Sequence, residues 1–314
     1  MMAAEPETKS VVHVIYSGLG GHAAVMFSLL EAGFLKSSRH HVVLAGVEPP
    51  LKEYTDRLDR MGLSWSYVGK PPGRGHFGFF RRLRAEFKKH RPDLLFLNGL
   101  AALPATLTYR LVPRQARPTI VLRESEPVQL KGCYQWVLLA LAHFGADKIV
   151  HLTPEAANSA QAKLKFLHRT DKVTIIPNGL DTEFFKPVAR PRDGDTIRIG
   201  MVSRLQHTKD HITLLAAFDK LRTARPKRRY KLYIAGDGAT RPQIESEIKL
   251  RKLQDAVVMC GTLDRIGVRD LLAKLDLYVH ATFGETMSNS IMQAMSMELP
   301  IIASDVDGLS LIHI

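Results

Sequence analysis

The chain has 314 residues, of which 45% are hydrophobic and 24% charged, a composition typical of a globular protein that can form two domains of about 150 residues. Lysine and arginine number 44 against 31 acidic residues, so the formal net charge is +13. Such a basic surface attracts phosphorylated small molecules, anionic lipid and nucleic acid, and the charge alone does not choose among them.

The sequence predicts neither a secretory signal nor a membrane-spanning segment. Its first ten residues, MMAAEPETKS, are polar, and the apolar run after them is short. The most apolar segment, starting at Trp136, has about half of the roughly 20 residues that a spanning helix needs. Cys133 and Cys260 match no metal or redox spacing, which predicts two inert thiols in a reducing, cytoplasmic compartment.

Short apolar strands alternate with amphipathic helices along the chain. The strands predicted in the first half are VVHVIYS, HVVLAG, LSWSYVG, DLLFLNG, TIVLRES, KIVHLT and VTIIPNG. Those predicted in the second half are IRIGMVS, KLYIAG, AVVMCG, LYVHAT and PIIAS, separated by helices over residues 211–225, 242–253, 268–274 and 289–297. This alternation indicates parallel sheets with helices on both faces.

The pattern restarts after the polar, proline-bearing stretch FKPVARPRDGD, residues 185–195. We therefore predict an α/β fold of two Rossmann-like, doubly wound domains facing each other across a cleft, with residues 1–185 and 196–314 joined by a linker over residues 186–195. Ligands of such sheets bind at the carboxyl ends of the strands. The second sheet stops after Ser304 without a further helix, so we expect this domain to be truncated at its C-terminus.

A glycine-rich turn, GLGGHA over residues 18–23, follows the first predicted strand and opens a helix. The backbone N–H groups of Gly20 and Gly21 can approach a phosphate at such a position. The turn also fits the dinucleotide fingerprint G-x-G-x-x-A, with Glu48 as the ribose acid, although the spacing to Glu48 is long. A tight turn without a ligand is the alternative. A ligand of some kind is favoured over an empty turn, but NAD itself is not favoured.

The loop SRLQHTKD, residues 203–210, follows the first strand of the second half. Arg204 offers a planar fork for two phosphate oxygens, and Lys209 adds a compact positive charge, so both side chains can reach one diphosphate. In a chain with 44 basic residues, a chance pair in a surface loop is an equal alternative.

The segment FGETMSNSIMQAMSMELP, residues 283–300, places an acid just before a helix. Ser288 or Asn289 is the predicted N-cap, and Ile291, Met292 and Met295 recur at the spacing of a core-facing stripe.

The free N–H groups of that helix's first turn favour a diphosphate. Glu285 then lies where it can accept hydrogen bonds from hydroxyls of whatever the phosphate carries, and Gln293 can bind a ribose.

Taken together, these segments resemble the retaining GT-B glycosyltransferases of family four (glycosyl transferases group 1). That family carries Arg and Lys in the loop after the first strand of its C-terminal domain and E-x7-E near the end of that domain. The likeness runs from Val11 to about Gly308, through IIPNGLDTEFF, SRLQHTKDHITLLAAF, LYIAGDG, CGTLDR and residues 283–300. The order of these pieces is specific, although each piece alone is not.

The resemblance implies that Arg204 and Lys209 hold the diphosphate of a sugar nucleotide and that Glu285 contacts hydroxyls of the transferred sugar. Gln293 takes the position of the second glutamate, which keeps a hydrogen bond to the ribose but removes a charge. Ser125 stands where many relatives have a histidine, which puts that histidine's contribution in doubt here.

The glycine loops would line the nucleotide. Gly236 belongs to AGDG, and the CGTL loop with Gly261, Thr262 and Leu263 would meet the base. From the N-terminal domain, Gly20 and Gly21 would face the phosphates or the acceptor.

The resemblance also implies a UDP- or GDP-sugar donor without a metal, because Arg and Lys take the place of the cation. Two pairs formally read D-x-D, at residues 193–195 and 305–307, but one lies in the linker and the other at the chain's end. Neither position favours a metal role.

Residues 75–92, GHFGFFRRLRAEFKKHRP, form a basic helix rich in Phe. Leu83 and Phe87 are expected to pack on the sheet. Phe77, Phe79 and Phe80, with the nearby cations, predict contact with an anionic membrane, and a solvated helix face is an equal alternative. No nucleic acid is expected, because no aromatic platform or reading motif accompanies the charge.

The expected reaction therefore moves a sugar from a nucleotide diphosphate to an acceptor hydroxyl with retention of configuration. The acceptor is expected to be a glycan or a lipid-linked molecule of the cell envelope. The protein itself is expected in the cytoplasm, as a peripheral protein at the inner face of the cytoplasmic membrane. An NAD-dependent Rossmann enzyme and a non-catalytic nucleotide-binding protein remain alternatives. The sequence does not determine the sugar, the base, the oligomeric state, the activity of a truncated chain or the origin of its last residues.

Overall fold

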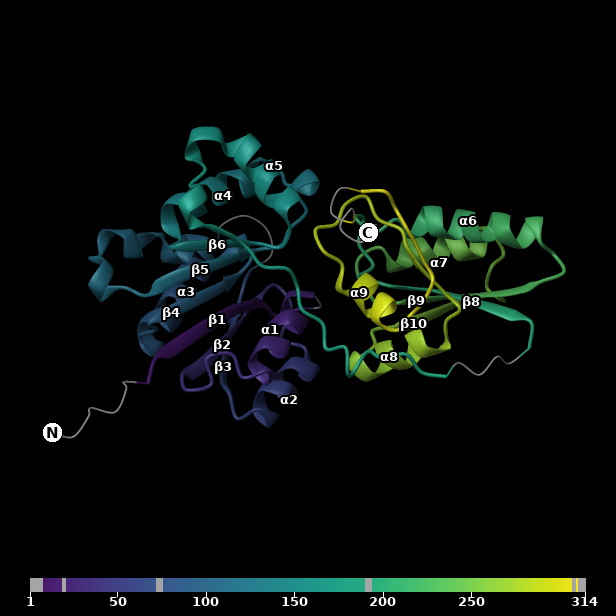
Figure 1. The fold of residues 1–314 in the computed structure, drawn as a ribbon, viewed down its shortest axis with the longest axis horizontal. Helices are drawn as coiled ribbons and strands as arrows, with labels where there is room; N and C mark the ends of the chain where they lie inside the picture. Colours follow the sequence, from purple (N-terminus) through teal and green to yellow (C-terminus); the bar gives the residue numbers. More distant parts are fainter. Residues whose placement is uncertain (1–7, 19–20, 72–75, 190–193, 307–308, 310–314) are drawn as a thin grey trace. The chain divides into compact units, whose positions relative to one another are not determined.

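The computed structural model describes residues 8–18, 21–71, 76–189, 194–306 and 309. The chain separates into two compact units, Met1–Gly179 and Leu180–Ile314, and each unit is built on one sheet (Figure 1). Every strand predicted from the sequence is present, and all pairings between named strands of the described residues are parallel.

The first unit contains a seven-stranded sheet in the order β3-β2-β1-β4-β5-β6-β7. The chain winds outward from β1 on one side and then returns to continue on the other, which places the switch point between β1 and β4. The strands are β1 Ser10–Tyr16, β2 Arg39–Gly46, β3 Ser64–Gly69, β4 Leu94–Asn98, β5 Thr119–Glu124, β6 Lys148–His151 and β7 Val173–Ile175.

Helices cover both faces of this sheet, because successive strand residues point to opposite sides. Val12 and Val14 pack in one core cluster with α3, η1 and α4, whereas Ile15 packs in another with α1 and α2. The helices are α1 Gly21–Glu31, α2 Lys52–Arg60, α3 Phe77–His90, η1 Leu100–Leu111, η2 Arg114–Ala116, η3 Val128–Leu130, α4 Cys133–Gly145, α5 Pro154–Leu164, η4 Lys165–Leu167 and η5 Thr170–Lys172.

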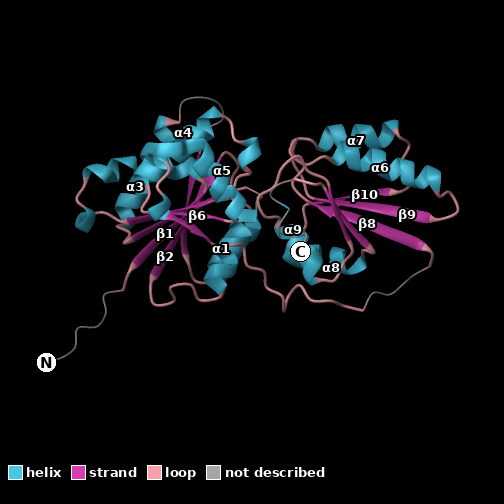
Figure 2. Cartoon of the chain, turned by 45° about the horizontal axis from the view of Figure 1, so that its top comes forward, coloured by secondary structure: helices cyan, strands magenta, loops and turns pink. Residues whose placement is uncertain are grey.

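The second unit contains a five-stranded sheet in the order β10-β9-β8-β11-β12. Figure 2 shows α6 and α7 on one face of this sheet and α8 on the other, in agreement with two separate core clusters. Its elements are β8 Thr196–Val202, α6 His211–Ala224, β9 Arg229–Ala235, α7 Arg241–Leu250, β10 Val257–Gly261, α8 Arg265–Lys274, β11 Leu277–His280, α9 Asn289–Ser296 and β12 Ile301–Ala303.

The division between the units falls before the stretch that we expected to be the linker. Phe185 is buried in the core of the second unit with Leu271 and Leu272, and Leu180 and Phe184 pack against the same cluster. Arg265 also pairs with Asp181, at 2.5 Å. The segment 180–185, which we assigned to the N-terminal domain, therefore packs with the second unit because its apolar side chains are buried there.

Candidate active site

The loops that follow β8 and β11 are tied together at the carboxyl edge of the second sheet, because these two strands are neighbours. The Asp210 N–H donates to the carbonyl of Ala281 at 3.0 Å, and the Phe283 N–H donates to that of Thr208 at 3.0 Å. Thr282 Oγ1 also donates to the Thr208 carbonyl, at 2.9 Å. The loop that carries Arg204 and Lys209 thus lies against the loop that carries Glu285.

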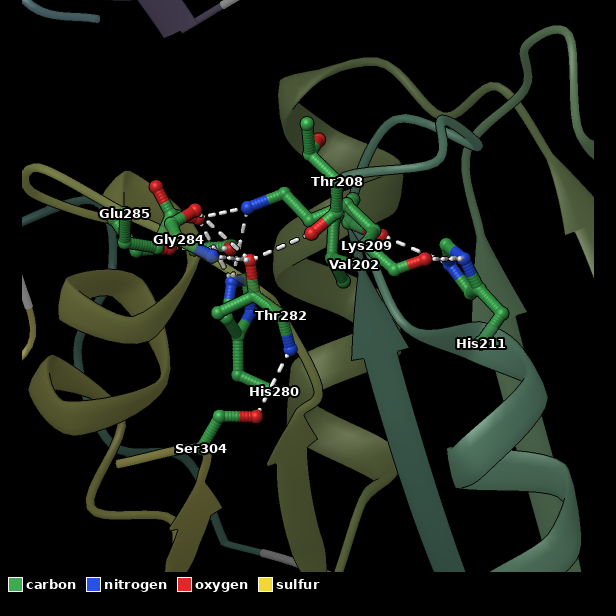
Figure 3. Close-up of polar contacts among 12 residues, drawn as sticks. Val202, Thr208, Lys209, His211, His280, Thr282, Gly284, Glu285 and Ser304 are labelled. Carbon is green, nitrogen blue, oxygen red and sulfur yellow. Dashed lines mark hydrogen bonds and ion pairs between the residues drawn. The ribbon is translucent and has the colours of Figure 1, made fainter. Parts of the chain in front are cut away.

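Lys209 and Glu285, which the sequence nominates separately, form an ion pair between these loops (Figure 3). Lys209 Nζ donates to Glu285 Oε1, and each side chain is only 14% exposed. His280 Nε2 lies 2.9 Å from the same carboxylate oxygen and 3.3 Å from Lys209 Nζ. A cation, a carboxylate and an imidazole therefore meet at one point.

A tyrosine behind the imidazole determines its orientation. His280 ends β11, and the alternation of the strand puts Tyr278 on the same face. The Tyr278 hydroxyl lies 3.2 Å from His280 Nδ1 and 3.2 Å from the carbonyl oxygen of Val202. Burial lowers the pKa of His280 and raises that of Tyr278, so both groups are neutral. Because Nε2 faces the ionised Glu285 carboxylate, we assign the ring proton to Nε2, which donates a hydrogen bond to Oε1. Nδ1 is then an acceptor and shares the single O–H of Tyr278 with the Val202 carbonyl.

The carboxylate of Glu285 is strongly held in its ionised form. Burial by itself raises its pKa, but the hydrogen bond from His280 and the charge of Lys209 outweigh burial and lower the pKa to about 2. Both contacts fall on Oε1. Among the described residues none is seen to bind Oε2, so this oxygen is available to hydroxyl groups.

Arg204 lies in the same loop as Lys209 but is placed differently. Its side chain is exposed, and within the described part of the chain it makes no hydrogen bond or ion pair. The backbone around it is held firmly: the Leu205 N–H donates to the Asp237 carbonyl at 2.9 Å, and the Thr240 N–H donates to the Leu205 carbonyl at 3.1 Å. The guanidinium is thus presented to solvent from a fixed backbone.

Two glycines after β9 make this close approach of loops possible. Gly236 has a φ of +132°, and a Cβ there would lie 1.9 Å from the Ser203 carbonyl oxygen. A Cβ on Gly238 would lie 2.4 Å from the carbonyl oxygen of Leu205. Only glycine fits at both positions. Gly236, predicted as a nucleotide-lining residue, therefore has a packing role, because it lets the chain after β9 approach the backbone of the loop that carries Arg204.

The CGTL loop joins the same edge through the backbone. Gly236 N–H donates to the carbonyl of Gly261 at 2.7 Å, and Gly261 has a φ of +68°. Thr262 is exposed, whereas Leu263 packs partly against the core under α8 and α9. Their contact with a base stays a prediction.

The first residues of α6 stabilise the loop that carries Arg204 and Lys209. The Asp210 side chain accepts from the Thr213 N–H at 3.0 Å and is the N-cap of the helix. His211 is buried, lies 3.0 Å from Ser203 Oγ through Nε2, and lies 3.1 Å from the Lys209 carbonyl through Nδ1. Burial lowers the pKa of His211 to about 4, so the imidazole that holds this loop through two hydrogen bonds is neutral.

Helix α9 begins where the sequence predicts, with Ser288 as the N-cap residue and Asn289 as the first helical residue. Ser288 does not cap through its side chain, and its Oγ lies 3.1 Å from that of Ser290. The Thr286 hydroxyl just before it is buried without a partner among the described residues. Gln293 is half-buried on the helix.

The apolar face of α9 differs in part from the prediction. Ile291 is buried as expected, and Ala294 and Met297 complete the packed face. Met295 is 46% exposed, so assigning it to the core was wrong. The helix starts at an orientation that directs positions 291 and 294, rather than 295, toward the sheet.

In the first unit, Gly20 lies outside the described residues, and Gly21 is the first residue of α1. Gly18 lies close to Glu48, since a Cβ on Gly18 would lie 2.0 Å from Glu48 Oε2. Glu48 therefore does lie beside the glycine turn, at the ends of two neighbouring strands.

Arg123 is buried and donates to Asn178 Oδ1 at 2.5 Å. Glu124 is buried with Lys131, whose Nζ lies 2.8 Å from Glu124 Oε1. Arg123 and Glu124 are thus parts of a buried polar cluster.

Each of the two D-x-D pairs of the sequence has one member, Asp193 or Asp307, outside the described residues. The described residues contain one group with metal-ligating atoms close together: His41, Glu86 and His90. The two imidazoles are stacked, with centroids 3.6 Å apart and planes at 17°, so their nitrogen lone pairs do not converge on one point. His41 also hydrogen-bonds Ser64 and Ser66 on β3, at 2.9 and 3.0 Å.

The sequence did not identify His280 or Tyr278 as site residues. A lone histidine and a tyrosine in an apolar strand most often fill a core. The available signal was positional: both residues alternate onto one face of the strand whose following loop carries Glu285.

Two doubly wound parallel sheets, one with cations and a carboxylate at its carboxyl edge, are the architecture of the GT-B glycosyltransferase class. The fold is shown by HepE of Anabaena, solved with UDP and glucose, which matches with a TM-score of 0.77 and 19% identity over 96% of this chain and 82% of that one. The chain belongs to the glycosyltransferases: residues 19–184 match the profile of "Glycosyltransferase Family 4" and residues 196–313 that of "Glycosyl transferases group 1".

Curated relatives agree with this assignment. EpsF of Bacillus subtilis, whose name describes it as a glycosyltransferase, is 32% identical over 320 residues, which is 95% of this chain and 79% of that protein. The gpi3 subunit of phosphatidylinositol N-acetylglucosaminyltransferase of Schizosaccharomyces pombe is 31% identical over 137 residues. This second match covers 44% of the chain and 30% of the relative's length.

Proposed function

We propose that this protein transfers a sugar from a nucleotide-diphosphate sugar to an acceptor hydroxyl with retention of configuration, in the synthesis of a cell-envelope glycan or glycolipid. The observation that carries the proposal is the meeting of Lys209 and Glu285 at the carboxyl edge of the second sheet. A cation for the leaving group and a carboxylate for the sugar thus lie side by side. The UDP and glucose bound by the structural neighbour HepE support a donor of this class.

In this proposal, Arg204 and Lys209 bind the diphosphate. Arg204 is exposed on a fixed backbone and supplies a planar fork, whereas the Lys209 ammonium has donors left after it binds one oxygen of Glu285. The N–H groups of Ser288 and Asn289 at the start of α9 add partial positive charge. These groups together would replace a metal ion, so none is expected to be needed.

Glu285 positions the sugar. Its Oε1 is occupied by Lys209 and His280, and Oε2 can accept hydrogen bonds from two neighbouring sugar hydroxyls. The low pKa of the carboxyl, about 2, keeps it an acceptor throughout the physiological pH range.

The barrier to transfer is cleavage of the bond between the sugar and the phosphate, which leaves negative charge on the diphosphate. Preorganised cations stabilise that developing charge, and the loss of one such donor typically costs about 10²–10³ in kcat. The acceptor would attack the same face that the diphosphate leaves, with the leaving phosphate taking the hydroxyl proton. No covalent sugar–protein intermediate is required.

The remaining nominated residues would bind the rest of the donor. Gln293 would hydrogen-bond the ribose, and Gly261, Thr262 and Leu263 would line the base. In the first unit, Gly20 and Gly21 would face the phosphates or the acceptor. A lipid-linked acceptor would bring the protein, from the cytoplasm, to the anionic inner face of a membrane.

A ligand-binding experiment tests the proposal directly. UDP or GDP should raise the melting temperature, because a ligand at 100 times its Kd stabilises the folded state by about 2.7 kcal/mol, and NAD should have no effect. A panel of nucleotide sugars scored for diphosphate release then identifies the donor, and the anomeric coupling constant of the product reports retention or inversion.

Stabilisation by NAD alone would favour a dinucleotide enzyme. Binding of a nucleoside diphosphate without turnover of any donor would favour a non-catalytic binding protein. An inverted product would contradict the retaining mechanism while leaving the donor assignment intact.

A further inference from the structure

The amino-terminal edge of the first sheet carries three neighbouring return segments. Residues 111–118 lead from η1 into β5, residues 144–147 lead from α4 into β6, and residues 165–172 lead from α5 into β7. Since β5, β6 and β7 are adjacent and parallel, the three segments lie side by side, at the edge opposite the carboxyl ends of the strands. We call this surface the amino-edge face (for α4, α5 and β6, see Figure 1).

A basic cavity of about 460 Å³ lies in the amino-edge face. Its lining includes two carboxylates, Asp147 and Asp171, against six cations: Arg110, Arg114, Arg117, Lys148, Arg169 and Lys172. The excess of cations makes the cavity a region of positive potential that attracts anionic groups.

Some of these cations hold the fold together. Lys172 Nζ donates to the carbonyls of His143 at 2.7 Å and Ala146 at 2.9 Å, at the C-terminal end of α4, and Arg110 Nη2 donates to the Ala146 carbonyl at 2.8 Å. Arg117 binds both oxygens of Asp147, each at 2.7 Å.

The cations are nevertheless crowded. Burial and the neighbouring positive charges of Arg117 and Arg114 lower the pKa of Arg110, and burial and the charges of Arg110 and Arg169 lower that of Lys172. An anion placed beside them would relieve this repulsion. Arg114, which lines the cavity, and Lys165, in the segment 165–172, are exposed and have no side-chain partner within the described residues, so they can bind one directly.

Large apolar side chains project from the same three segments. Leu111 is 87% exposed, Phe144 67% and Phe166 89%. Leu111 adjoins Arg110 and Val112 of the cavity lining, and Phe144 adjoins Gly145, whose carbonyl accepts from Arg110. Phe166 lies in the segment 165–172, which also supplies Arg169 and Lys172 to the lining. Large exposed apolar side chains on the same three segments that supply the cations of a basic cavity are the combination by which a peripheral protein binds the interface of an anionic membrane.

The basic helix nominated from the sequence is a poorer candidate. Of its three leading phenylalanines, Phe79 is buried and Phe80 packs against the core, so that only Phe77 is exposed. The expectation that all three contact a membrane is therefore wrong, because the helix turns two of them toward the sheet. None of the described helices is long and apolar enough to cross a bilayer.

We propose that the amino-edge face docks on an anionic phospholipid membrane, with Leu111, Phe144 and Phe166 inserted at the interface and Arg114 and Lys165 bound to lipid phosphates. The proposal deepens the membrane partner named in the proposed function. Its test uses no donor or acceptor, so its failure is distinguishable from a failure of sugar transfer.

Sedimentation with vesicles tests the apolar contribution. The full chain should sediment with vesicles of phosphatidylglycerol and phosphatidylcholine in equal parts, and should stay in solution with phosphatidylcholine alone. The double variant Phe144→Ser/Phe166→Ser should remain in solution with both. Leu111→Ser is the second variant if the double variant melts early, and Phe77→Ser on α3 is the matched control that should sediment like the natural protein.

The electrostatic contribution has its own pair of variants. Arg114→Glu/Lys165→Glu should bind anionic vesicles at least about twentyfold more weakly, because each cation near an anionic surface contributes about a fivefold gain. Lys227→Glu/Arg228→Glu changes the net charge by the same amount at exposed positions of the second unit and should bind almost normally.

Three results would overturn the proposal. The first is that the natural protein fails to sediment with anionic vesicles. The second is that Phe77→Ser abolishes binding while Phe144→Ser/Phe166→Ser keeps it. The third is that the Lys227/Arg228 control loses as much binding as the Arg114/Lys165 variant. The second outcome would assign the membrane contact to α3, and the third would reduce it to net charge.

Discussion

Replacement of Lys209 by methionine is the most informative single change, because it removes the charge and keeps the length of the stem. In the structure, Glu285 would lose the partner that shares its Oε1 and would keep the hydrogen bond from His280 at 2.9 Å. Breaking one partner out of a buried ion pair costs about 3–5 kcal/mol. Since His280 remains, we expect about 3 kcal/mol of destabilisation.

This loss is measurable as a shift in melting temperature. About 3 kcal/mol corresponds to a decrease of roughly 6–12 °C for a unit of this size. Sugar transfer should fall by at least about 10²–10³ in kcat, because the cation opposite the leaving diphosphate is gone. Lys220→Met, at an exposed position on α6, is the control and should alter neither quantity.

A double variant separates the two effects. Lys209→Met/Glu285→Gln removes both charges, so it should be more stable than the sum of the two single changes predicts, by about 2 kcal/mol, while remaining inactive. The reasoning would be refuted by additive stabilities, which would mean that the two side chains do not interact, or by near-normal turnover in Lys209→Met.

Further predictions concern the surroundings of this pair. Because the pKa of Glu285 is lowered from 4.5 to about 2, its ionised form contributes stability above about pH 4.5 that is lost as the pH falls. Between pH 6 and 3, the free energy of unfolding in urea should therefore decrease by about 2 kcal/mol more for the natural protein than for Glu285→Gln. Parallel curves of stability against pH would contradict this. His280→Leu removes a hydrogen bond to a charged group, so the acid limb of the pH–activity profile should move up by about one to two units, and an unmoved limb would assign His280 a packing role only. Gly236→Ala should destabilise the protein by at least about 3 kcal/mol, because the new Cβ would overlap the Ser203 carbonyl, whereas Gly179→Ala, with no atom within 4 Å of its added Cβ, is the neutral control in thermal melts.

Local patterns determined the elements and most of the nominated residues. Apolar runs bounded by Gly, Asn and Ser predicted each strand, because a buried parallel strand needs a continuous apolar stretch and its end needs a turn. Ser288 or Asn289 was predicted as an N-cap for the same kind of local reason, and residue type nominated Lys209 and Glu285. The matching profiles confirmed the glycosyltransferase family, and the retaining mechanism stays a proposal.

What the sequence by itself determined is therefore the alternation of strands and helices and the chemical type of the groups at strand ends. Only the tertiary structure decided which of these groups meet. Lys209 and Glu285 are 76 residues apart and pair because β11 lies next to β8 after the chain has passed through β9 and β10. Likewise, the rotation of α3 buries Phe79, whereas Phe166, in η4, is left 89% exposed. Contacts between distant segments depend on strand order and helix rotation, and neither is a property of any short stretch of sequence.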